Sequence, residues 1–532
     1  MKFIFVTGGV LSGLGKGITA SSIGRLLKSR GINVSAIKID PYLNLDAGTM
    51  DPFEHGEVYV LDDGAEVDLD LGNYERFMDA KLDRDHNITT GKVYASVIEK
   101  ERRGEFRGKT VQIIPHITNE IKESITRVAR NTGADVMIVE IGGTVGDIEA
   151  MPFLEAVRQL GTEVGRKENC TFVHTTLIPL MGTAKEPKTK PTQHSVKELM
   201  SLGIMPDMIV GRSSVAMTEE IRKKISLFCD VPLEAVVSAP DAPSIYQVPI
   251  TLEEQGVADF IIRRMRLTHL AKKLDLREWN DFLSRVADRS QEVTIALVGK
   301  YTRLTDTYLS HMEAFTHAGA HERCRPNMRL IDSDDITPET AEELLGDVHG
   351  ILVPGGFGQK GVDGKIHATT FARERGIPFT GVCLGFQLAA IEIARNVLGL
   401  EGANSVEFDP DTPHPIVNLL PGQEASMRLG SHAVTLAAGS LAHKLYGKKE
   451  IAERHRHIYD INPDYAEALE EAGWKFTGHS ESGRAEFGEL EGHPYFVGSQ
   501  FHPEFKSRPC RPTPMHLGLV RAAIAYRERG GA

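Results

Sequence analysis

Short apolar runs that end at glycine constrain the fold of this chain more than any other feature of its sequence. Buried parallel strands of an α/β sheet have this form, because helices cover both faces of such a sheet. The pattern begins twice, once at Phe3 and again at Val293. We therefore expect two doubly wound α/β domains. The strand-like runs are residues 3–6, 34–39 and 136–141 in the first series, and 293–298, 351–353 and 378–382 in the second.

The length of the chain, 532 residues, also favours two domains, since a single hydrophobic core stops growing near roughly 250–300 residues. Residues 267–291 are rich in charge and carry apolar residues at partly helical spacing, which predicts a helical linker. Residues 408–423 contain several prolines and predict a surface loop. The expected division is 1–266 for the first domain, 267–290 for the linker and 291–532 for the second domain.

Composition narrows the class of protein. Hydrophobic residues make up 41% and charged residues 25%, as in an ordinary globular protein. The net charge of −12 argues against nonspecific binding of nucleic acid, which requires a basic surface. The five cysteines form no CxxC pair, and no apolar run reaches the roughly 18 residues of a membrane span. Because no secretory leader precedes the first strand-like run, we expect a cytoplasmic protein without a membrane or nucleic-acid partner.

A glycine-rich segment, TGGVLSGLGKG at residues 7–17, follows the first predicted strand and precedes a helical pattern. Glycines let backbone N–H groups converge on anionic oxygens, and Lys16 can reach a terminal phosphate. A tight turn without a ligand is the alternative interpretation. Gly17 stands where a standard P-loop has Ser or Thr, which leaves Thr19 as a substitute hydroxyl and directs the search for metal ligands elsewhere.

Carboxylates near this segment are the candidates for magnesium ligands, since this ion prefers oxygen donors and keeps positions for water and phosphate. Glu140 ends an apolar strand-like run, where open α/β sheets place ligands. Asp68 and Asp70 alternate with apolar residues, so we expect both on one face of a strand. An ordinary solvated face is the equal alternative for either aspartate.

Three lysines between prolines and threonines, Lys185, Lys188 and Lys190, supply candidate counter-charge for a triphosphate. The prolines in this run would hold several of these cations in a fixed loop. A solvated surface loop is the alternative interpretation of this segment.

A candidate nucleophile, Cys383, lies in the segment GVCLG between a predicted strand and a predicted helix. Flanking glycines permit the sharp turn of a nucleophile elbow, and a thiolate near a helix N-terminus is strongly nucleophilic. Far downstream, His502 can act as the base and Glu504 can orient it. A backbone N–H of the segment PGGFG, residues 354–358, would complete an oxyanion hole. A lone Cys or His is usually structural, and we assign that role to Cys170, Cys229, Cys324 and Cys510.

Long sequence strings carry a family resemblance. Residues 1–266 resemble the synthetase half of the CTP synthase family through FVTGGVLSGLGKG, KIDPYLN, GTMDPFEHGEV, DLDLGNYERF, VQIIPHITNEI, VEIGGTVGDIE and KTKPTQHSVKEL, in that order. Residues 292–526 resemble a class I glutamine amidotransferase domain through PGGFG, GVCLGFQ and QFHPE. The resemblance implies an N-terminal, P-loop-like amidoligase domain and a C-terminal class I glutaminase domain.

The resemblance also implies residue roles, in addition to the catalytic set Cys383, His502 and Glu504. The implied ATP contacts are Gly13, Leu14, Gly15, Lys16, Gly17, Ile18, Asp70 and Asp241, and the implied magnesium ligands are Asp70 and Glu140. The implied UTP or CTP contacts are Ser12, Asp147, Ile148, Glu149, Lys188, Thr189, Lys190, Pro191, Thr192, Gln193 and Lys224, with Lys38 as a further phosphate contact. The implied glutamine contacts are Gly356, Leu384, Gly385, Phe386, Gln387, Glu407 and Arg456.

The reaction implied by the resemblance belongs to pyrimidine biosynthesis. ATP phosphorylates the uracil O4 of UTP, and ammonia released from glutamine displaces the phosphate to give CTP, with Mg²⁺ as cofactor. The resemblance further implies activation by GTP, inhibition by CTP and a homotetramer, and it is compatible with filament assembly.

Two alternatives remain open at this stage. One is a different ATP-dependent amidoligase, such as a cobyrinate-type amidase, which substrate use would distinguish. The other is a nucleotide-sensing scaffold, which loss of turnover with retained assembly would favour.

Overall fold

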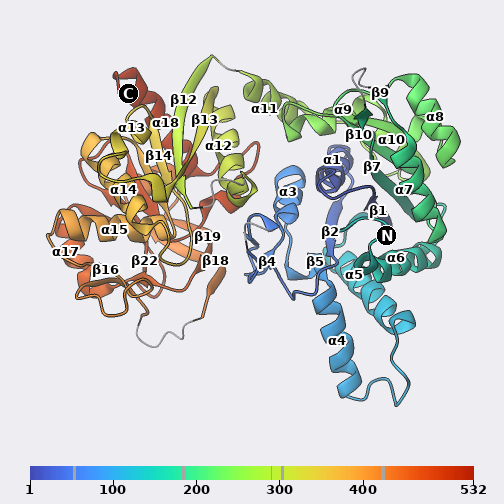
Figure 1. Ribbon diagram of the computed structural model, residues 1–532, viewed down its shortest axis with the longest axis horizontal. Helices are drawn as coiled ribbons and strands as arrows, with labels where there is room; N and C mark the ends of the chain where they lie inside the picture. Colours follow the sequence, from blue (N-terminus) through green and yellow to red (C-terminus); the bar gives the residue numbers. More distant parts are fainter. Residues whose placement is uncertain (52–54, 182–185, 289, 301–304, 421–425, 532) are drawn as a thin grey trace. The chain divides into compact units, whose positions relative to one another are not determined.

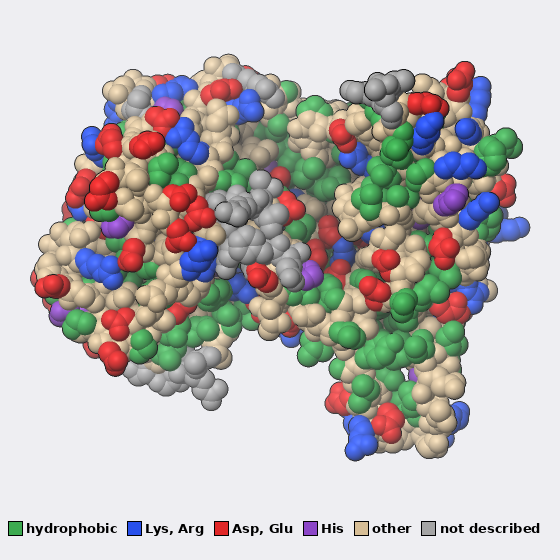
Figure 2. Space-filling model, viewed as in Figure 1, with side chains coloured by type: hydrophobic (Ala, Val, Ile, Leu, Met, Phe, Trp, Pro, Cys, Tyr) green, Lys and Arg blue, Asp and Glu red, His purple; other side chains and the backbone are tan. Residues whose placement is uncertain are grey.

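The structure is a computed structural model that describes residues 1–51, 55–181, 186–288, 290–300, 305–420 and 426–531 (Figure 1). The chain forms two compact units. The first unit contains Met1–Thr49 and Asp70–Arg277, and the second contains Met50–Leu69 and Glu278–Ala532. Acidic and basic side chains are mixed on the viewed face of each unit (Figure 2).

A seven-stranded parallel sheet forms the centre of the first unit, in the order β11-β10-β7-β1-β6-β2-β5. Strand β1 lies in the middle, and its residue Val6 pairs with Glu140 on β6. The central strands are buried along nearly their whole length, as their apolar runs predict. The strands are β1 Lys2–Gly8, β2 Val34–Asp40, β5 Asn87–Thr89, β6 Val136–Ile141, β7 Cys170–Leu177, β10 Met208–Ser213 and β11 Val236–Pro240.

Helices cover both faces of this sheet. Phe3 and Phe5 of β1 share a hydrophobic core with Ile121 and Ile125 of α5, while α1 packs against β1, β2 and β6. Alternate side chains of a strand point to opposite faces, so β1 contributes to two cores. The helices are α1 Lys16–Lys28, α3 Leu69–Met78, α4 Thr90–Arg102, α5 Thr118–Thr132, α6 Met151–Val164, α7 Lys190–Ser201, α8 Glu219–Cys229, α9 Val248–Glu254 and α10 Val257–Arg264; a small hairpin joins β8 Leu180–Met181 to β9 Glu186–Pro187.

The second unit contains a nine-stranded mixed sheet in the order β13-β12-β14-β15-β23-β22-β21-β18-β19. The first five strands are parallel and the last four extend the sheet with antiparallel pairs. The parallel part confirms the expected second α/β domain. The strands are β12 Gln291–Gly299, β13 Cys324–Asp332, β14 Gly350–Val353, β15 Phe379–Val382, β18 Arg428–Leu436, β19 Glu450–His457, β21 Trp474–His479, β22 Ala485–Leu490 and β23 Phe496–Ser499.

Two cores lie on opposite faces of this mixed sheet. Ile295 and Leu297 of β12 pack in one core with side chains of α12 and α18, whereas Ala296 and Val298 pack in the other with side chains of α14 and α15. The helices are α11 Arg277–Ala287, α12 Leu309–Glu322, α13 Ala341–Leu345, α14 Val362–Arg375, α15 Leu384–Asn396, α16 Leu441–Tyr446, α17 Ala466–Glu471 and α18 Pro514–Glu528; a small sheet joins β16 Asn404–Ser405, β17 Pro415–Asn418 and β20 Asp460–Ile461.

An early segment of the chain, Met50–Leu69, belongs to the second unit. It carries the hairpin β3 Tyr59–Val60 and β4 Glu66–Val67. The buried Tyr59 hydroxyl donates to the Phe505 carbonyl over 2.7 Å. The buried Arg454 guanidinium donates to Asp62 over 2.7 Å and to the Val60 carbonyl over 2.9 Å. These units therefore differ from the expected contiguous ranges 1–266 and 291–532.

Three local expectations need correction or restriction. The prediction of a strand through Asp68 and Asp70 is wrong, because β4 ends at Val67 and Asp70 lies in the first turn of α3. The expected lysine loop is helical from Lys190 onward, where α7 begins, and Lys185 lies outside the described residues. The expected surface loop at 408–423 contains β17, and its residues 421–423 lie outside the described range.

Candidate functional site

A glycine-rich turn joins β1 to α1 in the first unit. Gly13 and Gly15 have φ values of 73° and 80°, a left-handed conformation that glycine adopts without steric cost. Gly15 caps the N-terminus of α1, and Lys16 is its first residue. The Lys16 ammonium donates to the Gly143 carbonyl over 2.7 Å. Burial lowers the pKa of Lys16, although Glu140 partly opposes this shift. The turn has the geometry of a phosphate cradle.

Carboxylates from three elements surround Lys38 beside this turn. Its ammonium lies 3.2 Å from Glu140, 3.8 Å from Asp40, and in direct contact with Asp70. Glu140 is only 1% exposed, and it also accepts a hydrogen bond from the Tyr74 hydroxyl. Burial raises the pKa of Glu140 and, to about 6, the pKa of Asp40, while Lys38 counters both shifts. The carboxyl groups are therefore concentrated in a largely buried site, where the buried ammonium groups of Lys38 and Lys16 offset their charge.

Asp70 and Glu140 fit the chemistry of magnesium. A Cβ built on Gly17 would overlap Asp70 Oδ1 and lie 3.5 Å from Glu140 Oε2, so both carboxylates reach the space beside the first turn of α1. Within the described residues, no group of three or more His, Cys, Asp or Glu side chains forms a complete metal cage. Magnesium commonly uses one or two carboxylates and takes its other ligands from water and phosphate. This pair could hold the ion together with water and phosphate oxygens.

A buried hydrogen-bond chain links the phosphate turn to α7. The Thr7 hydroxyl lies 2.9 Å from His174 Nδ1, and His174 Nε2 lies 2.8 Å from the Ser195 hydroxyl. Ser195 in turn fills the space beside Gly9 so closely that a Cβ there would overlap its side chain. Burial lowers the pKa of His174 to about 3, which keeps its ring neutral. The chain holds the middle of α7, at Ser195, against the turn.

The predicted pyrimidine contacts lie on several segments of the first unit. The Asp147 carboxylate accepts from the Thr144 N–H over 2.7 Å, and Ile148 and Glu149 begin the short 3₁₀ helix Ile148–Ala150. Lys188 pairs with Glu186 at 2.7 Å on the surface. The residues Lys190, Pro191, Thr192 and Gln193 form the first turn of α7, Thr189 caps it, and Lys224 lies on α8.

The predicted ATP contact Asp241 is joined to the phosphate turn through an arginine. Arg212 donates to Asp241 Oδ1 over 3.0 Å, and its Nε lies 4.0 Å from a Cβ built on Gly15. Sequence reasoning did not identify Arg212. The structure thus places Asp241 near the residues that begin α1.

Cys383 occupies a sharp turn between β15 and α15 in the second unit. Its φ of 52° and ψ of −103° are unusual for a residue with a side chain, which marks a strained turn. The neighbouring glycines are required, because a Cβ on Gly385 would overlap the Val353 carbonyl and one on Gly381 would lie 2.5 Å from the Gly385 carbonyl. The expected nucleophile elbow is present in the structure.

His502 and Glu504 lie beside this turn. His502 Nδ1 is 2.7 Å from Glu504 Oε1. A Cβ on Gly355 would lie 2.8 Å from His502 Cε1 and 3.4 Å from Cys383 Cβ, so the loop packs against both groups. Burial disfavours the imidazolium, but Glu504 and Cys383 outweigh it and raise the pKa of His502 to about 10. Burial also opposes ionisation of Glu504, yet the imidazoles of His311 and His502 lower its pKa to about 2. The site stabilises an ionised carboxylate beside a strongly basic imidazole.

Most of the predicted glutamine contacts lie around the loop at Gly356–Gly358 and the start of α15, but one of them packs in the core. Glu407 accepts from the Gly358 N–H over 2.7 Å, and the Arg456 guanidinium lies over the Phe357 ring at 5.0 Å. Gly356, Leu384, Gly385 and Gln387 lie at the loop and the start of α15. The side chain of Phe386, by contrast, packs in the core against Trp474.

Two contacts of this site were missed by sequence reasoning. Glu66 Oε1 accepts from Arg456 Nε over 2.8 Å, although Glu66 lies in the early segment Met50–Leu69. Gln500 donates to the Cys383 thiol over 3.8 Å and accepts from Gln387 over 3.1 Å. The position of Gln500 in QFHPE could have indicated its role, whereas no local signal identifies Glu66.

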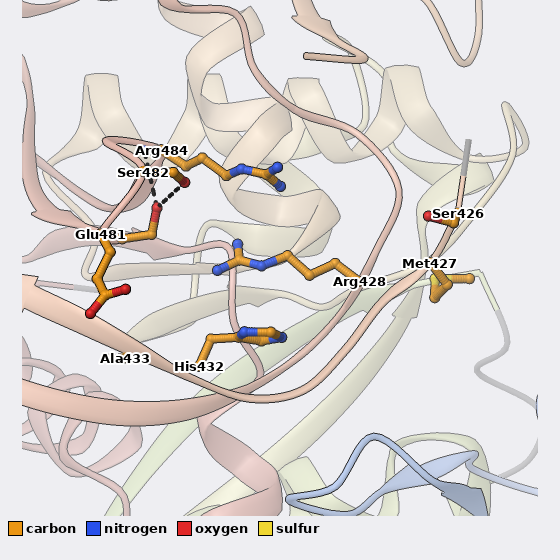
Figure 3. Close-up of a pocket in the computed structure, with 9 residues that line it drawn as sticks. Ser426, Met427, Arg428, His432, Ala433, Glu481, Ser482 and Arg484 are labelled. Carbon is orange, nitrogen blue, oxygen red and sulfur yellow. Dashed lines mark hydrogen bonds between the residues drawn. The ribbon is translucent and has the colours of Figure 1, made fainter. Parts of the chain in front are cut away.

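A separate open pocket of about 470 Å³ lies elsewhere on the second unit (Figure 3). Arg428 and Arg484 point into it, yet each is paired with a carboxylate, Glu486 at 2.6 Å and Asp460 at 3.1 Å. None of its lining residues is a predicted contact for nucleotide or glutamine. It is lined by Ser426, Met427, Arg428, His432, Ala433, Ser480, Glu481, Ser482 and Arg484.

Comparisons with known proteins agree across the whole chain. The CTP synthase N-terminus family matches residues 2–267, and the class-I glutamine amidotransferase family matches residues 303–522. CTP synthase of Methanopyrus kandleri is 56% identical over 532 residues, which covers 98% of this chain and 99% of that protein. CTP synthase of Thermococcus gammatolerans is 56% identical and covers 100% of both chains. The acivicin-bound glutaminase domain of Trypanosoma brucei CTPS is 37% identical, with a TM-score of 0.43, and covers 44% of this chain and 94% of that structure.

An α/β unit with a phosphate turn and a second unit with a cysteine nucleophile elbow define an ATP-dependent carbon–nitrogen ligase with its own glutaminase domain. The chain belongs to the CTP synthase family. No helix in the described part of the chain is long and apolar enough to cross a membrane.

Proposed function

We propose that this enzyme aminates UTP to CTP through a 4-phosphorylated UTP intermediate, using ammonia that its second unit releases from glutamine. The observation that carries the proposal is the elbow at Cys383 with His502 and Glu504 beside it, in a chain that also holds a phosphate turn. The first gives a nucleophile for an amide, and the second a site for ATP. GTP activation, CTP inhibition, a homotetramer and a cytoplasmic location are further parts of the proposal, which rest on the family.

The glutaminase half-reaction follows from the arrangement at Cys383. The thiolate attacks the side-chain amide carbon of glutamine, while backbone N–H groups of the Gly356 loop and of Leu384 receive the developing oxyanion. The imidazolium of His502 donates its proton to the departing nitrogen, so that ammonia leaves and a thioester remains. Water, deprotonated by the same imidazole, then hydrolyses the thioester to glutamate. Glu407 and Arg456 have charges that suit the α-amino and α-carboxylate groups of glutamine.

The synthetase half-reaction belongs to the first unit. Lys16 and the N–H groups of the turn bind the ATP phosphates, and Lys38 adds a buried cation beside them. Asp70 and Glu140 would hold magnesium, which neutralises charge on the transferring phosphoryl group. The UTP O4 attacks the γ-phosphorus and ADP leaves. Ammonia then adds to C4, and phosphate departs to give CTP.

Substitution of Cys383 by alanine tests this division of labour. We expect the variant to lose CTP formation from glutamine and to retain CTP formation from added ammonia, because the first unit needs only the free amine. Cys510→Ala, an exposed cysteine in the same unit, is the control and should keep both activities. Equal loss of both activities in Cys383→Ala would refute the proposal. Transfer of ¹⁸O from UTP O4 to inorganic phosphate would test phosphorylation at O4.

A further inference from the structure

A second imidazole faces the carboxylate that orients His502. His311 Nε2, on α12, lies 3.5 Å from Glu504 Oε1, the same oxygen that is 2.7 Å from His502 Nδ1. On its other side, His311 Nδ1 lies 3.0 Å from Nε2 of His516, on α18. The two helices pack against each other, and α12 also packs against the short helix that carries Glu504. Four buried groups therefore form a chain in the order His502, Glu504, His311 and His516.

The hydrogen-bonding roles in this chain can be assigned from charge and geometry. Burial lowers the pKa of His311 and, to about 3, the pKa of His516, so both rings are neutral near pH 7. A neutral imidazole has one N–H donor and one acceptor nitrogen. If His311 donated to His516, its Nε2 lone pair would face the ionised carboxylate of Glu504. The opposite assignment is therefore favoured: His516 donates to His311, and the Nε2–H of His311 faces Glu504 Oε1 at 3.5 Å, a longer distance than that of an ordinary hydrogen bond.

An unpaired atom supports this assignment. His516 Nδ1 is buried and has no hydrogen-bond partner among the described residues. In the favoured assignment this nitrogen carries only a lone pair, so no buried N–H is left without an acceptor. In the opposite assignment His516 Nδ1 would carry a buried N–H with no acceptor, which costs about 1–3 kcal/mol.

Core packing alone does not account for this pair of histidines. The His516 ring packs edge-on against Phe315 at 4.8 Å, and apolar side chains would fill the same space without burying polar nitrogens. From His516 the chain leads through His311 to a single carboxylate, Glu504. The titratable groups that face this carboxylate are His502 and its neighbour Cys383, His311, His516, Glu453 on β19 and Tyr446 on α16.

We propose that His311 is a positioning residue, held in one tautomer by His516. Its N–H donates to Glu504 and so weakens the hydrogen bond that this carboxylate accepts from His502. The inference rests on the proposed glutaminase role of Cys383, His502 and Glu504. No proton leaves His311 during turnover; its N–H shares Glu504 Oε1 with the N–H of His502. Without His311, Glu504 would accept more strongly from His502, and the imidazolium would give its proton to the departing ammonia less readily.

Substitutions at His311 test the proposal through the pH profile of glutamine hydrolysis. In His311→Leu we expect kcat to fall about 10-fold with KM within about twofold, and the basic limb of kcat/KM to move up by about half a pH unit. His311→Gln keeps an N–H donor near the Nε2 position and should restore most of kcat and the profile. His321→Leu, at an exposed position of the same helix, is the control. The rate at which iodoacetamide alkylates Cys383, measured across the same pH range, reports on the thiolate–imidazolium pair without turnover.

Each outcome of these measurements either supports or overturns the proposal. A His311→Leu variant with the wild-type profile and kcat would overturn the proposal, and so would an equal defect in the Leu and Gln variants. If His311→Leu does not fold, His516→Phe replaces it as the test, because it keeps His311 and removes the donor behind it. We expect about a threefold loss of kcat and a smaller shift there, and no change would again overturn the proposal. Wild-type protein that hydrolyses no glutamine would instead refute the proposed function.

Discussion

Asp70 occupies the space that a side chain on Gly17 would need. A Cβ at this position would overlap Asp70 Oδ1 and would also lie 3.5 Å from Glu140 Oε2. A standard P-loop has a serine or threonine hydroxyl here as a magnesium ligand. In this chain glycine leaves the space open, and a carboxylate from α3 enters it. The absence of the hydroxyl and the presence of Asp70 are two parts of one arrangement.

Gly17→Ala should therefore impair the synthetase activity selectively. The methyl group displaces Asp70 from the first turn of α1, and we expect CTP formation from ammonia to fall at least about 10-fold. Hydrolysis of glutamine should persist, because it belongs to the second unit. Ser29→Ala, at the other end of the same helix, should leave both activities near wild type. A fully active Gly17→Ala variant would contradict the role assigned to Asp70.

Glu66→Gln should weaken glutamine binding. Glu66 pairs with the Arg456 guanidinium at 2.8 Å. This charged pair holds the long arginine side chain in one orientation before the ligand binds. Without the pair, Arg456 would lose conformational entropy on binding glutamine. We expect KM for glutamine to rise about fivefold with a smaller change in kcat. CTP formation from ammonia should not change.

The control for Glu66 is Asp63→Asn, an exposed position in the same hairpin that keeps an acceptor for the Ala65 N–H. Kinetics of glutamine hydrolysis measure both variants. If Glu66→Gln has the KM of wild type, the contact with Arg456 is only structural.

Glu453→Gln should stabilise the second unit, and more so at high pH. Burial raises the pKa of Glu453 to about 7, although Lys506 opposes the shift. In the unfolded chain a glutamate has a pKa of about 4.3. The folded state therefore binds the extra proton between these values, and its stability falls as pH rises through about 7. Glutamine mimics the protonated acid and removes this dependence.

We expect the stability gain of Glu453→Gln over wild type to grow by on the order of 3 kcal/mol between about pH 4 and pH 8. Thermal unfolding of the second unit at several pH values measures the difference. Glu450→Gln, exposed on the same strand, should show no comparable trend. A constant difference between Glu453→Gln and wild type at all pH values would show that folding does not raise the pKa of Glu453.

The parts of the fold that sequence predicts are those with a local signal. The apolar runs at β1, β2, β6, β12, β14 and β15 predict strands because burial on both faces leaves few polar positions. The turn before Lys16 and the elbow at Cys383 are likewise local, since glycine is required at fixed neighbours. These two local signals alone predict the positions of both candidate sites.

The features that the sequence did not predict, or predicted wrongly, have physical reasons. Alternation over Asp68, Leu69 and Asp70 is compatible with a strand edge, but Leu71, Tyr74 and Phe77 continue at helical spacing, and all three are buried on α3. The antiparallel half of the second sheet was not predicted, because its strands have mixed burial and no uniform apolar run. The pairing of Glu66 with Arg456 spans 390 residues, and no short window of sequence contains such a contact.

The assignment of Met50–Leu69 to the second unit sets an order of events during synthesis. The hairpin leaves the ribosome long before Arg454 and Phe505, its buried partners, exist. It must remain unpaired while the rest of the first unit is made. A gene split between the codons for Arg277 and Glu278 would give a first product whose hairpin lacks its buried partners. The second product would lack the hairpin that these partners bury. Modular exchange of the glutaminase half would succeed only if the early hairpin is transferred with it.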